Sequence, residues 1–143
     1  MIVTDTTILL YAVGAEHEYA EPSRRFFDAV AEGRLSATTT VEAIQEFAHV
    51  YARRRSRAEV RRHTQRFAEL LSPLLVSDAA DLSVALRLFE RHSELGGFDA
   101  LLAATALSHE AEALLSADTG FAAVPRLRHV APGTAAFDRL LAA

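Results

Sequence analysis

Short apolar runs alternate with longer helical patterns along the whole chain, and this alternation constrains the fold more than any other feature. The segments between the runs carry apolar residues at the spacing of amphipathic helices. Strands that alternate with helices are typical of a parallel sheet covered by helices. We therefore expect an α/β fold with three layers (α/β/α) around a central, mostly parallel sheet of about four or five strands. The expected strands are 2–4, 35–37, 74–76, 113–116 and 128–130.

Several predicted helices begin at recognisable caps. Thr39 and Glu42 have the spacing of a capping box, with the threonine as N-cap and the glutamate three residues later. Ser77 or Asp78 can cap a later helix, and Gly96-Gly97 breaks the chain before an alanine-rich one. We expect helices at roughly 7–13, 22–31, 98–110 and 134–141, and three more that follow Thr40, the arginines near residue 55, and Asp78.

The length of 143 residues and an apolar fraction of 50% predict one domain, residues 1–143, with a substantial core. The chain contains no cysteine, which excludes disulfides and thiolate metal sites. The N-terminus has no basic region before its apolar run, and no apolar run is long enough to cross a bilayer. We therefore expect a cytoplasmic protein without membrane association.

The charge is unevenly distributed. The formal net charge is −4, and all 15 basic residues are arginines because the chain contains no lysine. Seven of these arginines and one glutamate lie between residues 53 and 66, here called the arginine-rich stretch, which carries a net charge of +6. The remainder carries −10, so the sequence predicts a basic patch on an acidic body.

Two aspartates directly follow predicted strands. Asp5 comes after strand 2–4, and Asp118 comes just after strand 113–116. Each has a local explanation, because Asp5 could cap a helix and Asp118 could start a turn. Ligands of open parallel sheets bind at the carboxyl ends of the strands, however. Together, the two aspartates therefore favour a shared site.

Two further acids lie on predicted helices. Asp99 follows Gly96-Gly97 in a first turn, where an acid also interacts favourably with the helix dipole. Glu46 lies beside the apolar face of its helix, where a glutamate is usually exposed to solvent. Its rival on that helix, Glu42, is already explained by the predicted capping box. Converging carboxylates without a lysine repel one another unless a hard cation such as Mg²⁺ or Mn²⁺ binds them. Such ions activate water for phosphodiester hydrolysis.

The four acids lie in four motifs that follow one another along the chain. The motifs are Val3-Thr4-Asp5-Thr6-Thr7, Ile44-Gln45-Glu46-Phe47, the segment from Phe98 to Ala106, and the segment from Leu115 to Phe121. In this order they resemble a PIN domain, and specifically the VapC-type toxin ribonucleases of bacterial toxin–antitoxin pairs. The resemblance covers essentially the whole chain, with Ser116 at a position where many relatives carry threonine.

The resemblance implies that the four acids Asp5, Glu46, Asp99 and Asp118 bind Mg²⁺ or Mn²⁺ and position the attacking water. Asp5 and Asp99 would be the closest ligands. A hydroxyl of Thr6 or Thr7 would orient an acid or bind a substrate phosphate. Relatives form homodimers and are held inactive by a small antitoxin, here expected to be a VapB-type protein. The implied activity is that of an endoribonuclease toxin.

The arginine-rich stretch would then contact the RNA backbone through Arg54, Arg55 and Arg57, because guanidinium groups bind phosphate in a bidentate manner. It could also be a solvated helix pair or a surface for an acidic partner.

Other function classes fit less well. Phosphoaspartate enzymes normally need a lysine near the phosphoryl group, and this chain has none. The alternative that remains is a non-catalytic PIN-like module that binds RNA or protein. Retention of all four acids argues against that alternative.

Overall fold

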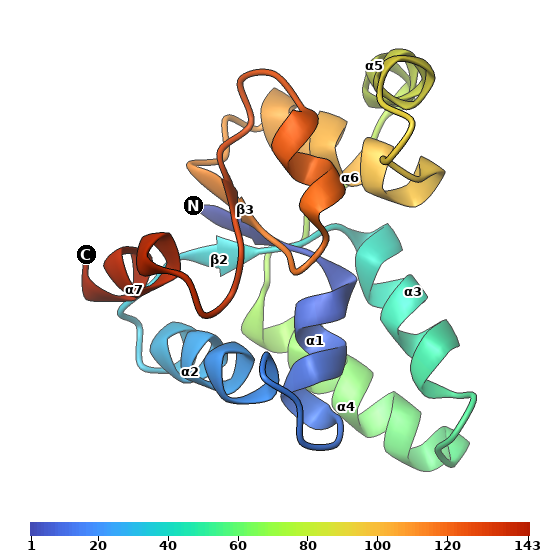
Figure 1. Cartoon of the computed structure of the whole chain (residues 1–143). Coiled ribbons are helices and arrows are strands. Elements are labelled where there is room, and N and C mark those ends of the chain that lie inside the picture. Colours follow the sequence, from blue (N-terminus) through green and yellow to red (C-terminus); the bar gives the residue numbers. More distant parts are fainter.

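Four short parallel strands form the centre of the computed structural model, which describes residues 1–143 (Figure 1). They are β1 (Ile2–Thr4), β2 (Ala37–Thr38), β3 (Ala113–Leu115) and β4 (His129–Val130), in the order β2-β1-β3-β4. In register, Ile2 lies opposite both Ala37 and Ala113. Because all pairs are parallel, the carboxyl ends of the strands meet at one edge. The expected α/β architecture is confirmed.

Seven α-helices and one 3-10 helix surround this sheet. None of the helices is both long and apolar enough to span a bilayer. The α-helices are α1 (Thr6–Val13), α2 (Ala20–Ala31), α3 (Val41–Tyr51), α4 (Arg57–Leu70), α5 (Ala79–Arg91), α6 (Gly97–Ser108) and α7 (Ala135–Ala142), and the 3-10 helix is η1 (Thr119–Ala123).

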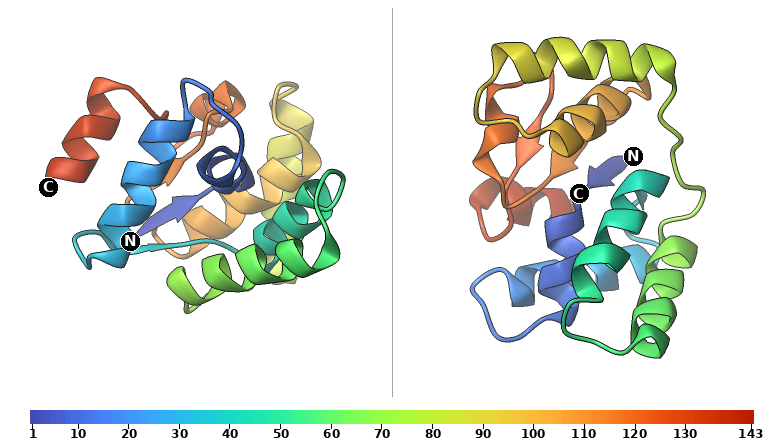
Figure 2. Two further views of the ribbon diagram at one scale, coloured as in Figure 1. Left: turned by 90° about the horizontal axis from the view of Figure 1, so that it is seen from below. Right: turned by 90° about the vertical axis from the view of Figure 1, so that its right-hand side faces the viewer.

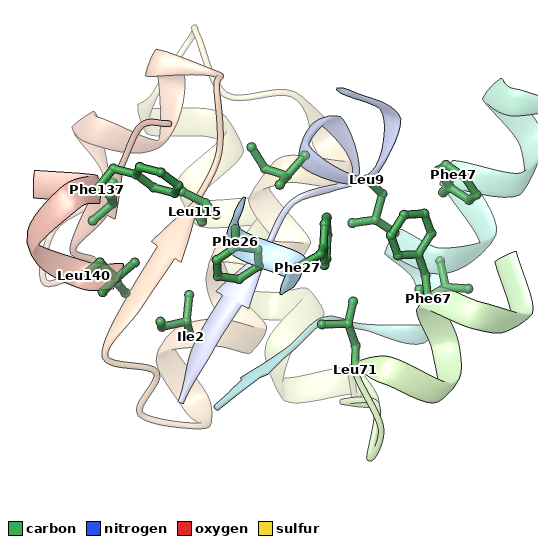
Figure 3. Packing of buried hydrophobic residues seen from close by; sticks show 14 residues of the cluster. Ile2, Leu9, Phe26, Phe27, Phe47, Phe67, Leu71, Leu115, Phe137 and Leu140 are labelled. Atoms are coloured by element: carbon green, nitrogen blue, oxygen red, sulfur yellow. The ribbon is translucent and has the colours of Figure 1, made fainter. Parts of the chain in front are cut away.

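Two hydrophobic clusters lie on opposite faces of the sheet and account for its three layers. Alternate residues of a strand point to opposite faces. Ile2 and Leu115 accordingly pack with α1, α2, α3, α4 and α7, where Phe26, Phe47 and Phe137 are fully buried (Figure 3). Val3 and Leu114 pack with α5, α6 and η1. Figure 2 shows α5 and α6 on one side of the strands and α1, α3 and α4 on the other.

The prediction of a strand at residues 74–76 is wrong. Leu75 forms only an isolated bridge, in which its amide donates to the Thr39 carbonyl and its own carbonyl accepts from the Val41 amide. Both leucines contribute to the core without belonging to a strand. Leu74 packs against the cluster on one face of the sheet, and Leu75 packs against the cluster on the other face. A short apolar run with this role has the same pattern as a buried strand.

The capping box predicted from Thr39 and Glu42 is also wrong. The N-cap of α3 is Thr40, whose hydroxyl accepts a hydrogen bond from the Ala43 amide at 3.1 Å. The Thr39 hydroxyl instead donates to the Thr4 carbonyl at 2.7 Å and joins the ends of β1 and β2. Glu42 is therefore the second residue of α3 and forms no capping hydrogen bond. The predicted capping box thus gives no reason to exclude Glu42 from the candidate site.

Candidate active site

Carboxylates from three elements line one cavity at the carboxyl edge of the sheet. Asp5 follows β1, Glu46 comes from α3, and Asp99 lies in the first turn of α6. Glu42, which was not expected there, lines the same cavity. We call this space the acid cavity; its other lining residues are Thr6, Thr40, Ala43, Phe98, Leu101 and Leu102.

Asp5 is the most deeply buried of these acids, with 3% of its surface exposed. Its Oδ1 accepts the Thr6 amide at 2.7 Å, which makes it the N-cap of α1. Its Oδ2 accepts the hydroxyls of Ser116 at 2.7 Å and Thr7 at 3.0 Å. Burial raises the pKa of Asp5, and these three hydrogen bonds oppose the rise. The carboxyl group is thus fixed in one orientation.

Ser116 links the two strand-end aspartates. Its hydroxyl donates to Asp5 and accepts the Asp118 amide at 2.9 Å. Asp118 caps η1, because its Oδ1 accepts the Gly120 amide at 2.8 Å. Asp118 does not line the acid cavity, but its charge raises the pKa of both Asp5 and Asp99. The sequence identified Ser116 only as a departure from relatives, whereas the structure shows that it positions two acids.

Asp99 is held among the other acids. Partial burial, followed by the charge of Asp5, the neighbouring carboxyl group of Asp118 and the charge of Glu46, raises the pKa of Asp99 to about 8. None of these acids forms an ion pair with an arginine, a histidine or the N-terminus. An uncompensated group of this kind favours either bound protons or a bound cation.

The two glutamates of α3 lie one turn apart on the side of the helix that faces Asp5. Burial and the charge of Asp5 raise the pKa of Glu46, and the nearby Thr6 side chain partly opposes this rise. The Oε2 atom of Glu42 is buried and has no hydrogen-bond partner. A buried oxygen without a partner is costly, so this oxygen is available to a bound ion or to an ordered water. The spacing of four residues between Glu42 and Glu46 could have revealed this pair, because residues at i and i+4 share a helix face.

Of the predicted substrate-binding residues, the two threonines lie at the site and the three arginines lie away from it. Thr7 orients Asp5, whereas the Thr6 hydroxyl donates to the Ala43 carbonyl at 3.1 Å and joins α1 to α3. Arg54 and Arg55 line a surface pocket at the turn between α3 and α4. Arg57 lines a groove between the same two helices. None of the three arginines lines the acid cavity.

The donor set of the acid cavity suits a hard divalent cation. All its charged groups are carboxylates, the ligands that Mg²⁺ and Mn²⁺ prefer. No three of the chain's histidine, aspartate and glutamate side chains are already arranged around one position for an ion. A shared ion site in this cavity would therefore require these carboxylates to come closer together than they are here.

Comparisons with known proteins show which family this chain resembles over most of its length. A family model described as PIN domain matches residues 2–127. Ribonuclease VapC7 of Mycobacterium tuberculosis is 45% identical over 145 residues, which cover 99% of this chain and 98% of that protein. Ribonuclease VapC13 of the same organism is 27% identical over 131 residues, which cover 92% of this chain and 100% of that protein.

Two solved structures share the fold. FitAcB from Neisseria gonorrhoeae has a TM-score of 0.69 at 18% identity and covers 90% of this chain and 96% of its own. FitAB bound to an IR36 DNA fragment has a TM-score of 0.72 at 17% identity, with coverage of 92% and 95% respectively.

Proposed function

The chain belongs to the PIN domain family, among its VapC members, and we propose that it is a metal-dependent endoribonuclease that acts as the toxin of a toxin–antitoxin pair. The observation that supports this most strongly is the convergence of carboxylates from β1, α3, α6 and the end of β3 without any ion pair. The substrate class follows from the relatives named ribonucleases. We expect the protein to act in the cytoplasm, where its RNA substrate would be.

Asp5 and Asp99 would hold Mg²⁺ or Mn²⁺ most directly, and Glu46 and Asp118 would complete the site. The buried and unpartnered Oε2 of Glu42 supports this fit, because an ion or its bound water would satisfy that oxygen. The ion, when bound, activates water and stabilises the negative charge on the phosphoryl group.

The chain's own residues prepare this chemistry. Ser116 and Thr7 fix the orientation of Asp5, and Ser116 also holds the backbone of Asp118 in place. The raised pKa of Asp99 favours a proton on this group of acids when no ion is bound, and a bound ion would displace that proton. Phe98, at the start of α6, lines the cavity and is 73% exposed, so it offers an apolar surface beside the acids.

Three partners follow from this function. The RNA backbone would contact Arg54, Arg55 and Arg57 at the start of α4 and the turn before it. A VapB-type antitoxin would hold the toxin inactive. A second copy of the chain would cover the exposed apolar residues of α5, which recur at helical spacing and are 49%, 59% and 53% exposed for Leu82, Leu86 and Phe89.

The function is tested by comparing the wild-type chain with Asp99→Asn on total RNA, first with Mg²⁺ or Mn²⁺ and then with EDTA. We expect the wild-type chain to give discrete cleavage products when the ion is present. The wild-type chain with EDTA and the Asp99→Asn variant should give none. Loss of one metal-binding carboxylate should slow cleavage by at least about 100-fold. Circular dichroism controls for folding. Cleavage that survives both chelation and the substitution would contradict the mechanism.

A further inference from the structure

The carbonyl group of Ser116 lies where the backbone pairing of β3 with β4 ends. Along this parallel ladder the Leu114 amide donates to the Arg128 carbonyl at 2.8 Å, and the Ser116 amide donates to the Val130 carbonyl at 3.1 Å. In a parallel ladder, a residue that donates to one residue of the neighbouring strand accepts from the residue two positions further on. The next donor for the Ser116 carbonyl would therefore be residue 132, which is a proline and has no N–H group.

The side chain of His129 supplies the missing donor. His129 lies opposite Leu114 in the register, so its ring projects to the face of the sheet that α6 and η1 cover. There its Nε2 lies 2.9 Å from the Ser116 carbonyl oxygen, and the ring packs beside Phe121 with a centroid separation of 6.2 Å. Because a carbonyl oxygen can only accept, Nε2 carries the hydrogen. His129 is half-buried and belongs to none of the four motifs.

This hydrogen bond fixes the second of the two peptide groups that flank Ser116. The first is held by the bond from the Ser116 amide to Val130. Between them, the Ser116 side chain is fully buried, and its hydroxyl donates to Asp5 and accepts the Asp118 amide. A rotation of the second peptide group would displace the chain that leads to Asp118. It would also move the hydroxyl out of its place between the two aspartates.

We propose that His129 is a positioning residue, which acts through the Ser116 carbonyl to hold Asp5 and Asp118 in place for a metal ion. The role of the ion rests on the proposed function, whereas the hydrogen bonds do not. His129 does not line the acid cavity, so its effect passes through Ser116. If His129 only filled space beside Phe121, an apolar side chain could replace it without consequence for the two aspartates.

The test compares variants with the wild-type chain in the absence of RNA. His129→Leu removes the donor and keeps an apolar side chain beside Phe121. His129→Gln keeps the donor, because its amide nitrogen is as many bonds from Cβ as Nε2 is. His109→Leu is the matched control, since Nδ1 of His109 also lies 3.0 Å from a backbone carbonyl, that of Thr105 near the end of α6. Isothermal titration measures Mn²⁺ affinity, and NMR measures hydrogen exchange of the Asp118 amide.

His129→Leu should weaken Mn²⁺ binding by about tenfold, as the loss of a group that supports metal ligands does. The Asp118 amide should exchange about tenfold faster, because its local structure opens more often. His129→Gln should keep both quantities within about threefold of the wild-type values, and His109→Leu should leave both unchanged. Thermal melts check that each variant is folded. If His129→Leu does not fold, His129→Asn replaces it, because its amide is too short to reach the carbonyl.

The proposal is overturned if His129→Leu lowers Tm but leaves Mn²⁺ affinity and Asp118 exchange unchanged, since His129 would then only stabilise the fold. Equal losses in His129→Leu and His109→Leu, or no recovery in His129→Gln, would overturn it as well. Failure of the proposed function is distinguishable. A wild-type chain that binds Mn²⁺ but cleaves no RNA contradicts that function alone. If it binds no Mn²⁺, the metal site is wrong, and exchange of the Asp118 amide decides the role of His129.

Discussion

At the scale of single residues, some acids of the candidate site also stabilise the helix that they precede. Asp5 and Asp118 are helix caps, as a local reading of the sequence allows, and both also belong to the group of interacting acids. Glu42 shows the opposite case. The capping box predicted for this residue does not form. Glu42 instead lines the acid cavity, where its Oε2 atom is buried without a hydrogen-bond partner. A local explanation of an acid therefore does not exclude a functional one.

Glu42→Gln should lower Mn²⁺ affinity by roughly tenfold or more, as the loss of a group that supports metal ligands does. Without an ion, the same change should raise Tm, because it removes a carboxylate whose Oε2 is buried without a hydrogen-bond partner. Isothermal titration and thermal melts measure the two effects. Glu59→Gln is the matched control, since Glu59 is a half-buried glutamate in the first turn of α4 and does not line the acid cavity. If Tm falls and Mn²⁺ affinity stays the same, Glu42 is a structural residue.

At the scale of elements, one close approach sets the geometry between η1 and the segment before α6. Gly120 lies in η1 directly under the Glu94 carbonyl, with Asp118 Oδ1 also near. Both segments lead to site acids, namely Asp118 at the start of η1 and Asp99 in α6. The packing of these two elements therefore determines how Asp118 approaches Asp99.

Gly120→Ala should destabilise the protein by about 1–3 kcal/mol, because its Cβ meets backbone that cannot easily move. Gly97→Ala is the control. No atom lies within 4 Å of a Cβ at Gly97, and alanine there should leave stability equal or raise it by up to about 1 kcal/mol. Urea unfolding measures both. Equal stabilities of the two variants would show that the approach at Gly120 is not restrictive.

At the scale of the whole molecule, charge and apolar surface are segregated. Arginines gather around α4 and the turn before it. The outward side of α5 carries the exposed apolar residues Leu82, Leu86 and Phe89. A polyanion bound around α4 would therefore leave this apolar surface of α5 free for a second copy of the chain.

Leu86→Glu should convert a homodimer to a monomer, because it places a charge at the centre of the apolar surface on α5. Light scattering coupled to size exclusion measures the mass of each form. Val41→Glu, an exposed apolar residue on α3 that is 47% exposed, serves as the control and should leave the mass unchanged. A wild-type chain that elutes as a monomer at all concentrations would refute the dimer.

The sequence by itself determined the architecture, because hydrophobic periodicity and the order of strands and helices depend on local spacing. It also determined that Asp5 and Asp118 follow neighbouring strands and that Asp99 begins a helix. It could not separate a buried strand from the apolar segment at Leu74 and Leu75, since both bury the same side chains.

Only the tertiary structure decided which acids share a cavity and which hydrogen bonds hold them. Ser116 joins Asp5, 111 residues away in sequence, to the backbone of Asp118. Whether Thr39 or Thr40 caps α3 depends on the contact of Thr39 with β1, and that choice leaves Glu42 free for the acid cavity. Contacts of this kind form between segments far apart in the chain, so no local pattern encodes them.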